Sequence, residues 1–385
     1  MRAPVVLIFL TIFLDLLGVG LLLPVLPYIV SGYQNDALTV GLVTLSYSAA
    51  QFLMTPVLGS LSDRYGRRPV LLVSLFGTAV GYFLFGWADS LAMIVFSRLL
   101  DGITGGNIST AQAYLADITP PQDRAKSFGL IGAAFGLGFL LGPALGGQIA
   151  RLGLRAPAYA AGGLAIVTMA LAFFLLPESL PPELRRTTPI SWNPFRQILA
   201  ALQRKNVQML LIVSFLFMLA YSQLQSHFAY YTMARWRLNE QDNALYLTYL
   251  GLMAVIMQGF LIRRLTPIFG ERKLSLIGLG LGISGLLVTA VAPGPLWLYL
   301  AMTFLAGGSG LAVPSMNALI SQRATAGEQG WVLGVAQSMS AFARVVGPLM
   351  AGALFDWIAP PAPFFGGACV IIVALLLLRT AILRH

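Results

Sequence analysis

A regular succession of long apolar segments limits the folds open to this chain. A helix that spans a bilayer needs about 20 consecutive apolar residues, and the sequence contains twelve such runs joined by polar connections. Hydrophobic residues make up 57% of the 385 residues and charged residues only 10%, far from the composition of a soluble domain. We therefore predict an all-α membrane protein with twelve transmembrane helices, near residues 4–30, 37–60, 69–87, 91–115, 126–150, 156–176, 207–232, 243–262, 274–292, 296–320, 329–354 and 363–381.

The charges in the connections predict the orientation of these helices. Lys and Arg are concentrated in connections on the side of the N-terminus, whereas Arg151, Arg155, Arg235 and Arg237 fall on the opposite side. Because positively charged loops remain in the cytoplasm, both termini are expected there. The net charge of +10 is thus spread over loops and does not form a basic surface interleaved with aromatics. This pattern does not indicate a nucleic-acid partner.

The chain shows an internal repeat. One long polar connection, residues 177–206, separates a predicted N-terminal six-helix bundle (1–176) from a C-terminal one (207–385). At a constant offset of 205 residues, glycines and prolines coincide: Gly102 with Gly307, Gly105 with Gly310, Gly129 with Gly334, Gly142 with Gly347, Pro143 with Pro348 and Gly147 with Gly352. Parallel six-helix repeats are one of the architectures of secondary transporters, which bind substrate near the bilayer midplane and work by alternating access.

Several kinds of chemistry are excluded. The single cysteine, Cys369, cannot form an internal disulfide, and one cysteine with two histidines is too few for a zinc site. The chain has no nucleophile elbow, phosphate-binding loop or paired metal ligands. We therefore expect no enzymatic activity, no cofactor and no ATP-driven transport. The remaining energy source for transport is coupling to an ion gradient, most simply that of the proton.

A short polar hairpin lies between the second and third apolar runs, with the sequence GSLSDRYGRRP over residues 59–69. Its glycines, Gly59 and Gly66, are expected to allow close helix approach and a tight turn. Asp63 lies near the end of the preceding helix, and Arg64, Arg67 and Arg68 hold the loop on one side of the membrane.

The repeat fails at this hairpin in an informative way. At the same offset the second half keeps the cations, as Arg272 and Lys273, but has Ile268 opposite Asp63 and Gln322 opposite Asp117. We therefore hypothesise that Asp63, Arg67 and Asp117 form a cytoplasmic ion-pair latch that steadies the outward-facing state.

Four ionisable residues fall inside predicted membrane helices: Asp15, Arg98, Asp101 and Arg344. Each costs roughly 3 kcal/mol at the centre of a helix, so they are expected to face a cavity. Arg98 and Asp101 are three residues apart and share a helix face, and Asp15 lies at a similar depth. Because burial disfavours a charged carboxylate and a nearby arginine favours it, such a cluster can load and release a proton. Arg344 is assigned only to the outer half of the cavity.

The motifs together are similar to those of a known family. Residues 59–69 resemble the G-x-L-x-D-R-x-G-R-R-P loop of the major facilitator superfamily. The stretch from Asp15 to Gly20 with Pro24 and Pro27, and the stretch 98–106, look like helix motifs of the twelve-helix drug:proton antiporters. Residues 138–147 fit the antiporter pattern G-x-x-x-G-P-x-x-G-G through Gly138, Gly142, Pro143, Gly146 and Gly147.

The chain resembles bacterial tetracycline:proton antiporters most. The resemblance implies a monomeric, multi-pass protein of the bacterial inner membrane that exchanges a drug-like small molecule for protons within membrane lipids. It also departs from those exporters, because the positions of their membrane acids and histidine correspond here to Gly81, Gly282 and Ala254. A tetracycline–metal chelate is therefore a less favoured substrate than a cationic or neutral lipophilic molecule held by aromatic and amide side chains. The candidates for that surface are Asn107, Gln112, Tyr221, Gln223, Gln225, Tyr246, Tyr249, Asn317 and Gln337, together with Arg344.

Two alternatives remain open at this point. The chain could take up a sugar or another metabolite by proton symport, in which case residues 138–147 would be only a packing motif. A non-transporting receptor would leave the latch loop without a purpose. His227, next to Phe228, Tyr230 and Tyr231, is predicted to belong to an interfacial aromatic belt and not to a proton relay.

Overall fold

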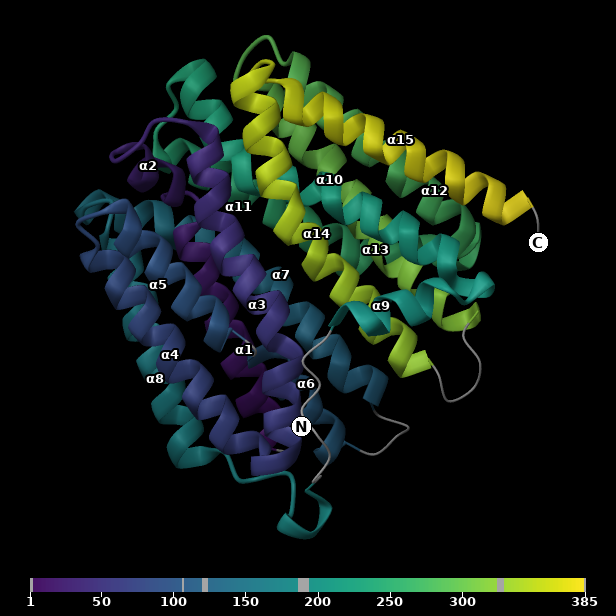
Figure 1. Cartoon of the computed structure of the whole chain (residues 1–385). Coiled ribbons are helices and arrows are strands. Elements are labelled where there is room, and N and C mark those ends of the chain that lie inside the picture. The colour runs from purple at the N-terminus through teal and green to yellow at the C-terminus, as the bar shows by residue number, and fades with distance from the viewer. Residues whose placement is uncertain (1–2, 106, 120–123, 186–193, 324–328, 384–385) are drawn as a thin grey trace. The chain divides into compact units, whose positions relative to one another are not determined.

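A computed structural model describes residues 3–105, 107–119, 124–185, 194–323 and 329–383 (Figure 1). Throughout these ranges the regular secondary structure is helical, as predicted. The helices of the first half are α1 (Ala3–Leu22), α2 (Leu26–Ser31), α3 (Ala37–Tyr65), α4 (Arg67–Trp87), α5 (Leu91–Thr104), α6 (Asn107–Ile118), α7 (Arg124–Ile149) and α8 (Ala156–Leu175). Those of the second half are α9 (Pro194–Leu202), α10 (Lys205–Trp236), α11 (Glu240–Ile256), α12 (Ile262–Val291), α13 (Trp297–Arg323), α14 (Gln329–Trp357) and α15 (Ala362–Leu383).

The chain folds into two compact units. The first comprises Met1–Gln34 and Ser46–Pro194, and the second comprises Asn35–Leu45 and Phe195–His385. The first turns of α3 thus pack within the second unit, whereas the rest of this continuous helix packs within the first. A division by sequence alone at the long polar connection assigns all of α3 to the N-terminal bundle.

Nine helices in the described ranges are long and apolar enough to cross a membrane. They correspond to the predicted spans other than 91–115, 126–150 and 243–262. In these three regions, α5, α6 and α11 are shorter than a bilayer requires. The 26 residues of α7 are long enough, but α7 is not among the nine. The number twelve stays a prediction.

Two predicted spans are divided in the structure, and a third, 243–262, continues through a π-helical turn without a break. The run 4–30 forms α1 and the separate short helix α2, because the prolines at 24 and 27 lack the amide hydrogen that a continuous helix needs. The run 91–115 ends as α5 with Gly105 as the C-cap, and α6 begins two residues later. After α11, the π-helical turn Met257–Leu261 leads into α12.

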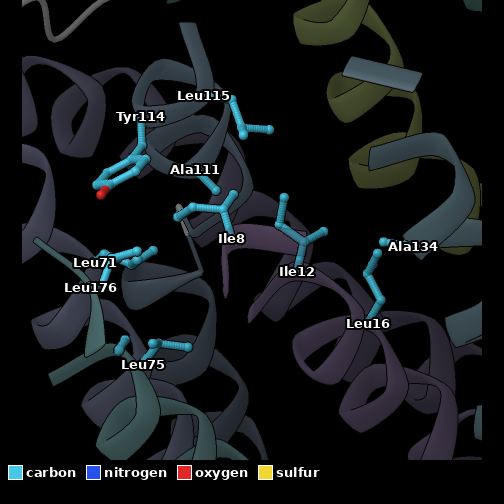
Figure 2. Close-up of a cluster of buried hydrophobic side chains, with 11 residues drawn as sticks. Ile8, Ile12, Leu16, Leu71, Leu75, Ala111, Tyr114, Leu115, Ala134 and Leu176 are labelled. Atoms are coloured by element: carbon cyan, nitrogen blue, oxygen red, sulfur yellow. The ribbon is translucent and has the colours of Figure 1, made fainter. Parts of the chain in front are cut away.

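The core of the first unit is built on one face of α1. Figure 2 shows Ile8, Ile12 and Leu16, spaced one helical turn apart, pointing into the same apolar cluster. Their partners in this cluster are Leu71 and Leu75 of α4, Ala111, Tyr114 and Leu115 of α6, Ala134 of α7, Ala172 of α8 and Leu176. This cluster fixes α1, which carries Asp15, against α4, α6, α7 and α8.

The glycine motif of α7 packs directly against α1. A Cβ atom on Gly142 would lie 2.5 Å from the Cα atom of Gly20, and one on Gly146 would lie 2.4 Å from the Leu21 carbonyl oxygen. A Cβ atom on Gly138 would lie 2.7 Å from Cβ of Leu16. The stripe of small residues therefore lets the two backbones touch, as in other closely packed membrane helices. Pro143 and Gly147 lie on the same helix and are buried.

The second unit repeats this arrangement at the offset found in the sequence. There α10 packs along α14 as α1 packs along α7. Gly347, the counterpart of Gly142, lies against α10, where a Cβ atom would meet the Leu219 carbonyl oxygen at 3.1 Å and would overlap the Ser222 side chain. The internal repeat is therefore a repeat of helix packing as well as of glycine positions.

Substituting Gly142 by alanine should destabilise the protein. The added methyl group has no space beside Gly20, and overpacking of this kind costs about 1–3 kcal/mol. Gly163→Ala in α8 is the matched control, because a Cβ atom there meets nothing within 4 Å. In thermal melts of the purified protein in detergent, Gly142→Ala should melt well below the wild type and Gly163→Ala should not. Equal melting temperatures for the two variants would contradict this packing.

Candidate functional site

A buried ion pair lies within α5. The Arg98 Nη1 and Asp101 Oδ2 atoms are 3.2 Å apart, and the two side chains are only 8% and 4% exposed. Gly81 of α4 makes room for the pair, because a Cβ atom at this position would lie 2.9 Å from Cβ of Asp101. The predicted pairing on one helix face is thus present, in a part of the first unit that water scarcely reaches.

The Arg98 guanidinium is only partly satisfied by this pair. It lies over the rings of Tyr82 and Phe85 of α4, with its carbon 5.3 Å and 4.6 Å from the ring centroids, within the range of cation–π contacts. Its Nε and Nη2 atoms are buried and have no hydrogen-bond partner among the described residues. The guanidinium therefore has two nitrogen atoms that can donate hydrogen bonds to a ligand or to water.

Tyr82 brings Asp15 into the same site. The Asp15 carboxylate, half-buried on α1, interacts electrostatically with Tyr82, as do Asp101 and Arg98. At Gly18, one turn further along α1, a Cβ atom would meet the Tyr82 ring at 3.4 Å. The structure therefore groups the three predicted proton-coupling residues around one fully buried tyrosine. Sequence reasoning missed Tyr82, whose single hydroxyl in an apolar run gives little signal.

The predicted latch residues also meet. Arg67, buried at the start of α4, forms an ion pair with Asp63 of α3 at 2.5 Å and another with Asp117 of α6 at 3.0 Å. Its Nη1 atom donates a further hydrogen bond to Ser62 Oγ at 2.6 Å. One guanidinium thus joins the cytoplasmic ends, as predicted from loop charge, of three helices in the first unit.

Glu178 completes this network and was not predicted. Its carboxylate, which follows α8, accepts hydrogen bonds from the backbone amides of Arg67 at 2.9 Å and Arg68 at 3.3 Å. It therefore caps the first turn of α4, where a negative charge is favoured by the helix dipole. The neighbouring Ser179 hydroxyl donates to the Asp117 carboxylate at 3.0 Å.

The other hairpin residues have separate roles. Gly66 has φ of 107°, which favours glycine and confirms the tight turn between α3 and α4. The expected close approach at Gly59 is wrong, since a Cβ atom there meets no described atom within 4 Å. Arg64 is exposed beside the ring of Tyr65, and Arg68 donates to the Phe173 carbonyl oxygen.

The second unit contains a buried amide among the predicted substrate residues. Gln223 of α10 is 1% exposed, and neither its Nε2 nor its Oε1 atom has a hydrogen-bond partner among the described residues. On the same helix, Tyr221 stacks on Phe217 and its hydroxyl interacts with Ser309 of α13. A buried polar group without a partner is costly, so Gln223 is a strong candidate for contact with a ligand.

Other predicted substrate residues lie in different surroundings. Tyr246 and Tyr249 of α11 pack around Tyr299, and their hydroxyls contact the Pro295 carbonyl oxygen and the Thr303 hydroxyl, respectively. They belong to an aromatic cluster that holds α11 against α13. The remaining candidates are half-buried, except for the exposed Gln337: Gln112 of α6, Gln225 of α10, Asn317 of α13 and Arg344 of α14. The side chain of Asn107, at the start of α6, lies outside the described residues.

The three positions predicted to depart from the tetracycline exporters, Gly81, Gly282 and Ala254, lie in packed or half-buried surroundings. Gly81 adjoins Asp101, and a Cβ atom on Gly282 would meet Phe217 at 3.3 Å and Ile371 at 3.4 Å. Ala254 is half-buried on α11. In the described part of the chain, no group of three or more His, Cys, Asp and Glu side chains could hold a metal ion.

Comparison with known proteins finds relatives that match nearly the whole chain. The chain is 32% identical to the class C tetracycline resistance protein of Escherichia coli, over 97% of this chain and 95% of that protein. It is 29% identical to multidrug resistance protein 2 of Bacillus subtilis, over 94% and 91% of the two chains. The crystal structure of the human organic anion transporter MFSD10 (TETRAN) matches with a TM-score of 0.77 and 28% identity, over 98% of this chain and 99% of that one.

The family is shown directly. A sequence model of the Major Facilitator Superfamily matches residues 8–348, and matches again at 244–384. The resemblance inferred from the hairpin and helix motifs is therefore confirmed, as is the all-helical membrane fold. The matching family consists of transporters and not of enzymes. This chain belongs to the major facilitator superfamily of membrane transporters.

Proposed function

We propose that this protein is a proton-coupled exporter of small lipophilic molecules. The names of its relatives support this class of substrate, because they include tetracycline and multidrug resistance proteins that match over nearly their whole length. The chain would act as a monomer in a bacterial inner membrane and alternate between inward-facing and outward-facing states.

The buried Arg98–Asp101 pair is the observation that carries the proposal. Ionisable side chains in the membrane cost several kcal/mol and are kept where they bind ions or substrates. A pair needed only for packing would have its polar atoms satisfied, whereas Arg98 keeps two buried N–H groups without a described partner. We infer that this part of the first unit exchanges its partners during transport.

The two carboxylates would carry the proton. Asp101 is paired with Arg98, and Asp15, which interacts electrostatically with Tyr82, is less deeply buried. Hydration favours the charged carboxylate and burial favours the protonated one, so opening to one side and then the other would load and release a proton. Each proton that crosses contributes about 2.3 kcal/mol per 100 mV to the export cycle.

Two classes of substrate, which differ in charge, are candidates. Aromatic and amide groups such as Tyr221 and Gln223 suit a neutral or cationic lipophilic molecule. The unpartnered N–H groups of Arg98 favour a second candidate, an organic anion whose carboxylate would accept both hydrogen bonds. The name of the human relative, an organic anion transporter, is in line with this second candidate.

The latch would steady one transport state. Arg67 is held by two acids from two helices, and Glu178 fixes the helix end that carries it. We propose that this network stabilises the outward-facing state, and that it separates when the cytoplasmic side opens.

Replacement of Asp101 by asparagine should abolish drug-driven proton movement. The amide cannot carry the proton and leaves the Arg98 charge buried without a counter-ion. Everted vesicles, acid inside and loaded with a pH-sensitive dye, would receive a lipophilic cation, a tetracycline, an organic anion and a sugar in turn. We expect one drug class to dissipate the gradient with the wild type and with the control Asp89→Asn, which alters an exposed loop acid, but not with Asp101→Asn.

The outcome of this panel separates the candidates. Dissipation by the anion alone selects the organic-anion substrate, and dissipation by the cation selects the other candidate. If Asp101→Asn is as active as the wild type, the assignment of the proton site is wrong. If only the sugar moves protons, in right-side-out vesicles, export itself is wrong.

Replacement of Asp63 by asparagine should stop transport without removing the protein from the membrane. The change takes one acid from Arg67 at the partly exposed end of α3 and leaves the buried apolar core intact. Immunoblots of membranes would give the protein level, and drug accumulation in cells would give transport. Accumulation as low as in wild-type cells, at an equal protein level, would show that the Arg67–Asp63 pair is not needed.

A further inference from the structure

The start of α3 is tightly packed inside the second unit. A Cβ atom on Gly41 of α3 would lie 2.6 Å from the carbonyl oxygen of Pro348 in α14. A Cβ atom on Gly352, one turn further along α14, would lie 2.7 Å from Cα of Leu38. The two backbones therefore touch at both positions.

Acidic side chains cap this end of α3. The two carboxylate oxygens of Asp356, in the last turn of α14, accept hydrogen bonds from the amides of Ala37 at 3.1 Å and Leu38 at 2.7 Å. Asp36 accepts from the amide and the hydroxyl of Thr39, at 2.7 Å and 2.8 Å. The first amides of a helix have no partner within it, so these acids satisfy donors that would otherwise need water.

His227 of α10 is buried against the same turn. It is 0% exposed, and its Nε2 atom lies 2.9 Å from the carbonyl oxygen of Ala37. Because a carbonyl can only accept, Nε2 carries the hydrogen. Its Nδ1 atom lies 2.7 Å from the Ser226 hydroxyl, which can donate to it. With the Ser226 hydroxyl donating to Nδ1, the neutral imidazole makes a hydrogen bond at each ring nitrogen, and the complete burial of the ring favours this uncharged form.

This environment differs from the aromatic belt expected from the sequence. Phe228, Tyr230 and Tyr231 are buried within the unit along with His227, and none of them is more than 5% exposed. The titratable groups that face this turn are Asp356 from α14, Asp36 before α3 and Tyr230 from α10. Tyr230 donates to the Asn35 side chain at 3.3 Å. Among the described residues, His227 is thus the one basic group in a site formed by acids and a helix end.

We propose that His227 is a second proton-binding group of this transporter, and that it takes its proton when the first turn of α3 leaves α10 and α14. A charged imidazole with no exposed surface is costly, and water removes that cost once α3 has moved. The proton from solvent would bind Nδ1. The Ser226 hydroxyl would then donate to the backbone carbonyl oxygen of Gln223, 3.2 Å away. Protonation therefore favours the released form of α3.

The proposal rests on the proposed function, because it adds a group of the second unit to a proton-coupled cycle. Residues 46–65 of α3 belong to the first unit, whereas its first turns, up to residue 45, belong to the second. The loop charges predict that this end lies opposite the cytoplasm. Protons from outside would thus favour opening to the outside.

Hydrogen exchange of residues 37–45 tests the proposal on the intact purified protein, without drug or gradient. Exchange would be measured by mass spectrometry at about pH 7.5 and 5.5, either side of the ordinary histidine pKa of about 6.5. Each rate would be divided by that of the unfolded chain at the same pH. For linkage to one proton, the wild type should lose protection by at most about tenfold per pH unit.

His227→Gln should show no such pH dependence, because the glutamine amide can still donate to Ala37 and does not titrate. His385→Gln changes the only other histidine and should behave as the wild type. Asp356→Asn should lower protection at both pH values. A pH-independent wild type, or a His227→Gln variant that keeps the wild-type pH dependence, would overturn the proposal. Failure of drug–proton exchange in vesicles would instead count against the proposed function. The hydrogen-exchange measurement does not depend on that function.

Discussion

The Arg98–Asp101 pair is the constraint on which the first unit depends. A guanidinium and a carboxylate with less than a tenth of their surface exposed must be held by exact surroundings, because either charge alone would be strongly destabilising there. Gly81 gives Asp101 its space, and the rings of Tyr82 and Phe85 cover Arg98. The apolar face of α1 then places Asp15 beside the same tyrosine. The helices of this unit thus hold the Arg98 and Asp101 charges in a buried site.

The two units share a packing scheme but differ in chemistry. Both use a glycine near a proline to bring one pair of long helices into contact, α1 with α7 and α10 with α14. The acids of the proposed proton site and of the proposed latch lie in the first unit. The second unit offers the uncharged amide of Gln223 and the neutral imidazole of His227 in the matching part of α10. A duplicated scaffold has therefore been given two different sets of polar groups.

Much of the fold and part of the site could be predicted from the sequence. Apolar length predicts membrane helices because the bilayer requires it, and helical spacing predicts that Arg98 and Asp101 pair. The latch acids were found because the repeat lacks them in its second copy. These inferences work since each depends on local spacing or on comparison of the chain with itself.

The parts that could not be predicted depend on contacts between distant residues. Glu178 caps a helix more than a hundred residues before it, and nothing in its own segment indicates this. Tyr82 and the burial of His227 likewise follow from which helices adjoin, and a run of aromatics near a helix end looks the same whether it faces lipid or protein. The division at α1–α2 was missed because apolar composition continues through the break, and the division at α5–α6 because the apolar runs on either side were counted as one span.

The central claim is that the acids of the first unit hold a proton that a bound substrate displaces. The most direct measurement is proton release from the purified protein in weakly buffered detergent solution, followed with a pH indicator as substrate is added. The account predicts release with the wild type, and none with the double variant Asp15→Asn/Asp101→Asn. Equal proton release from the double variant, with substrate binding retained, would contradict it.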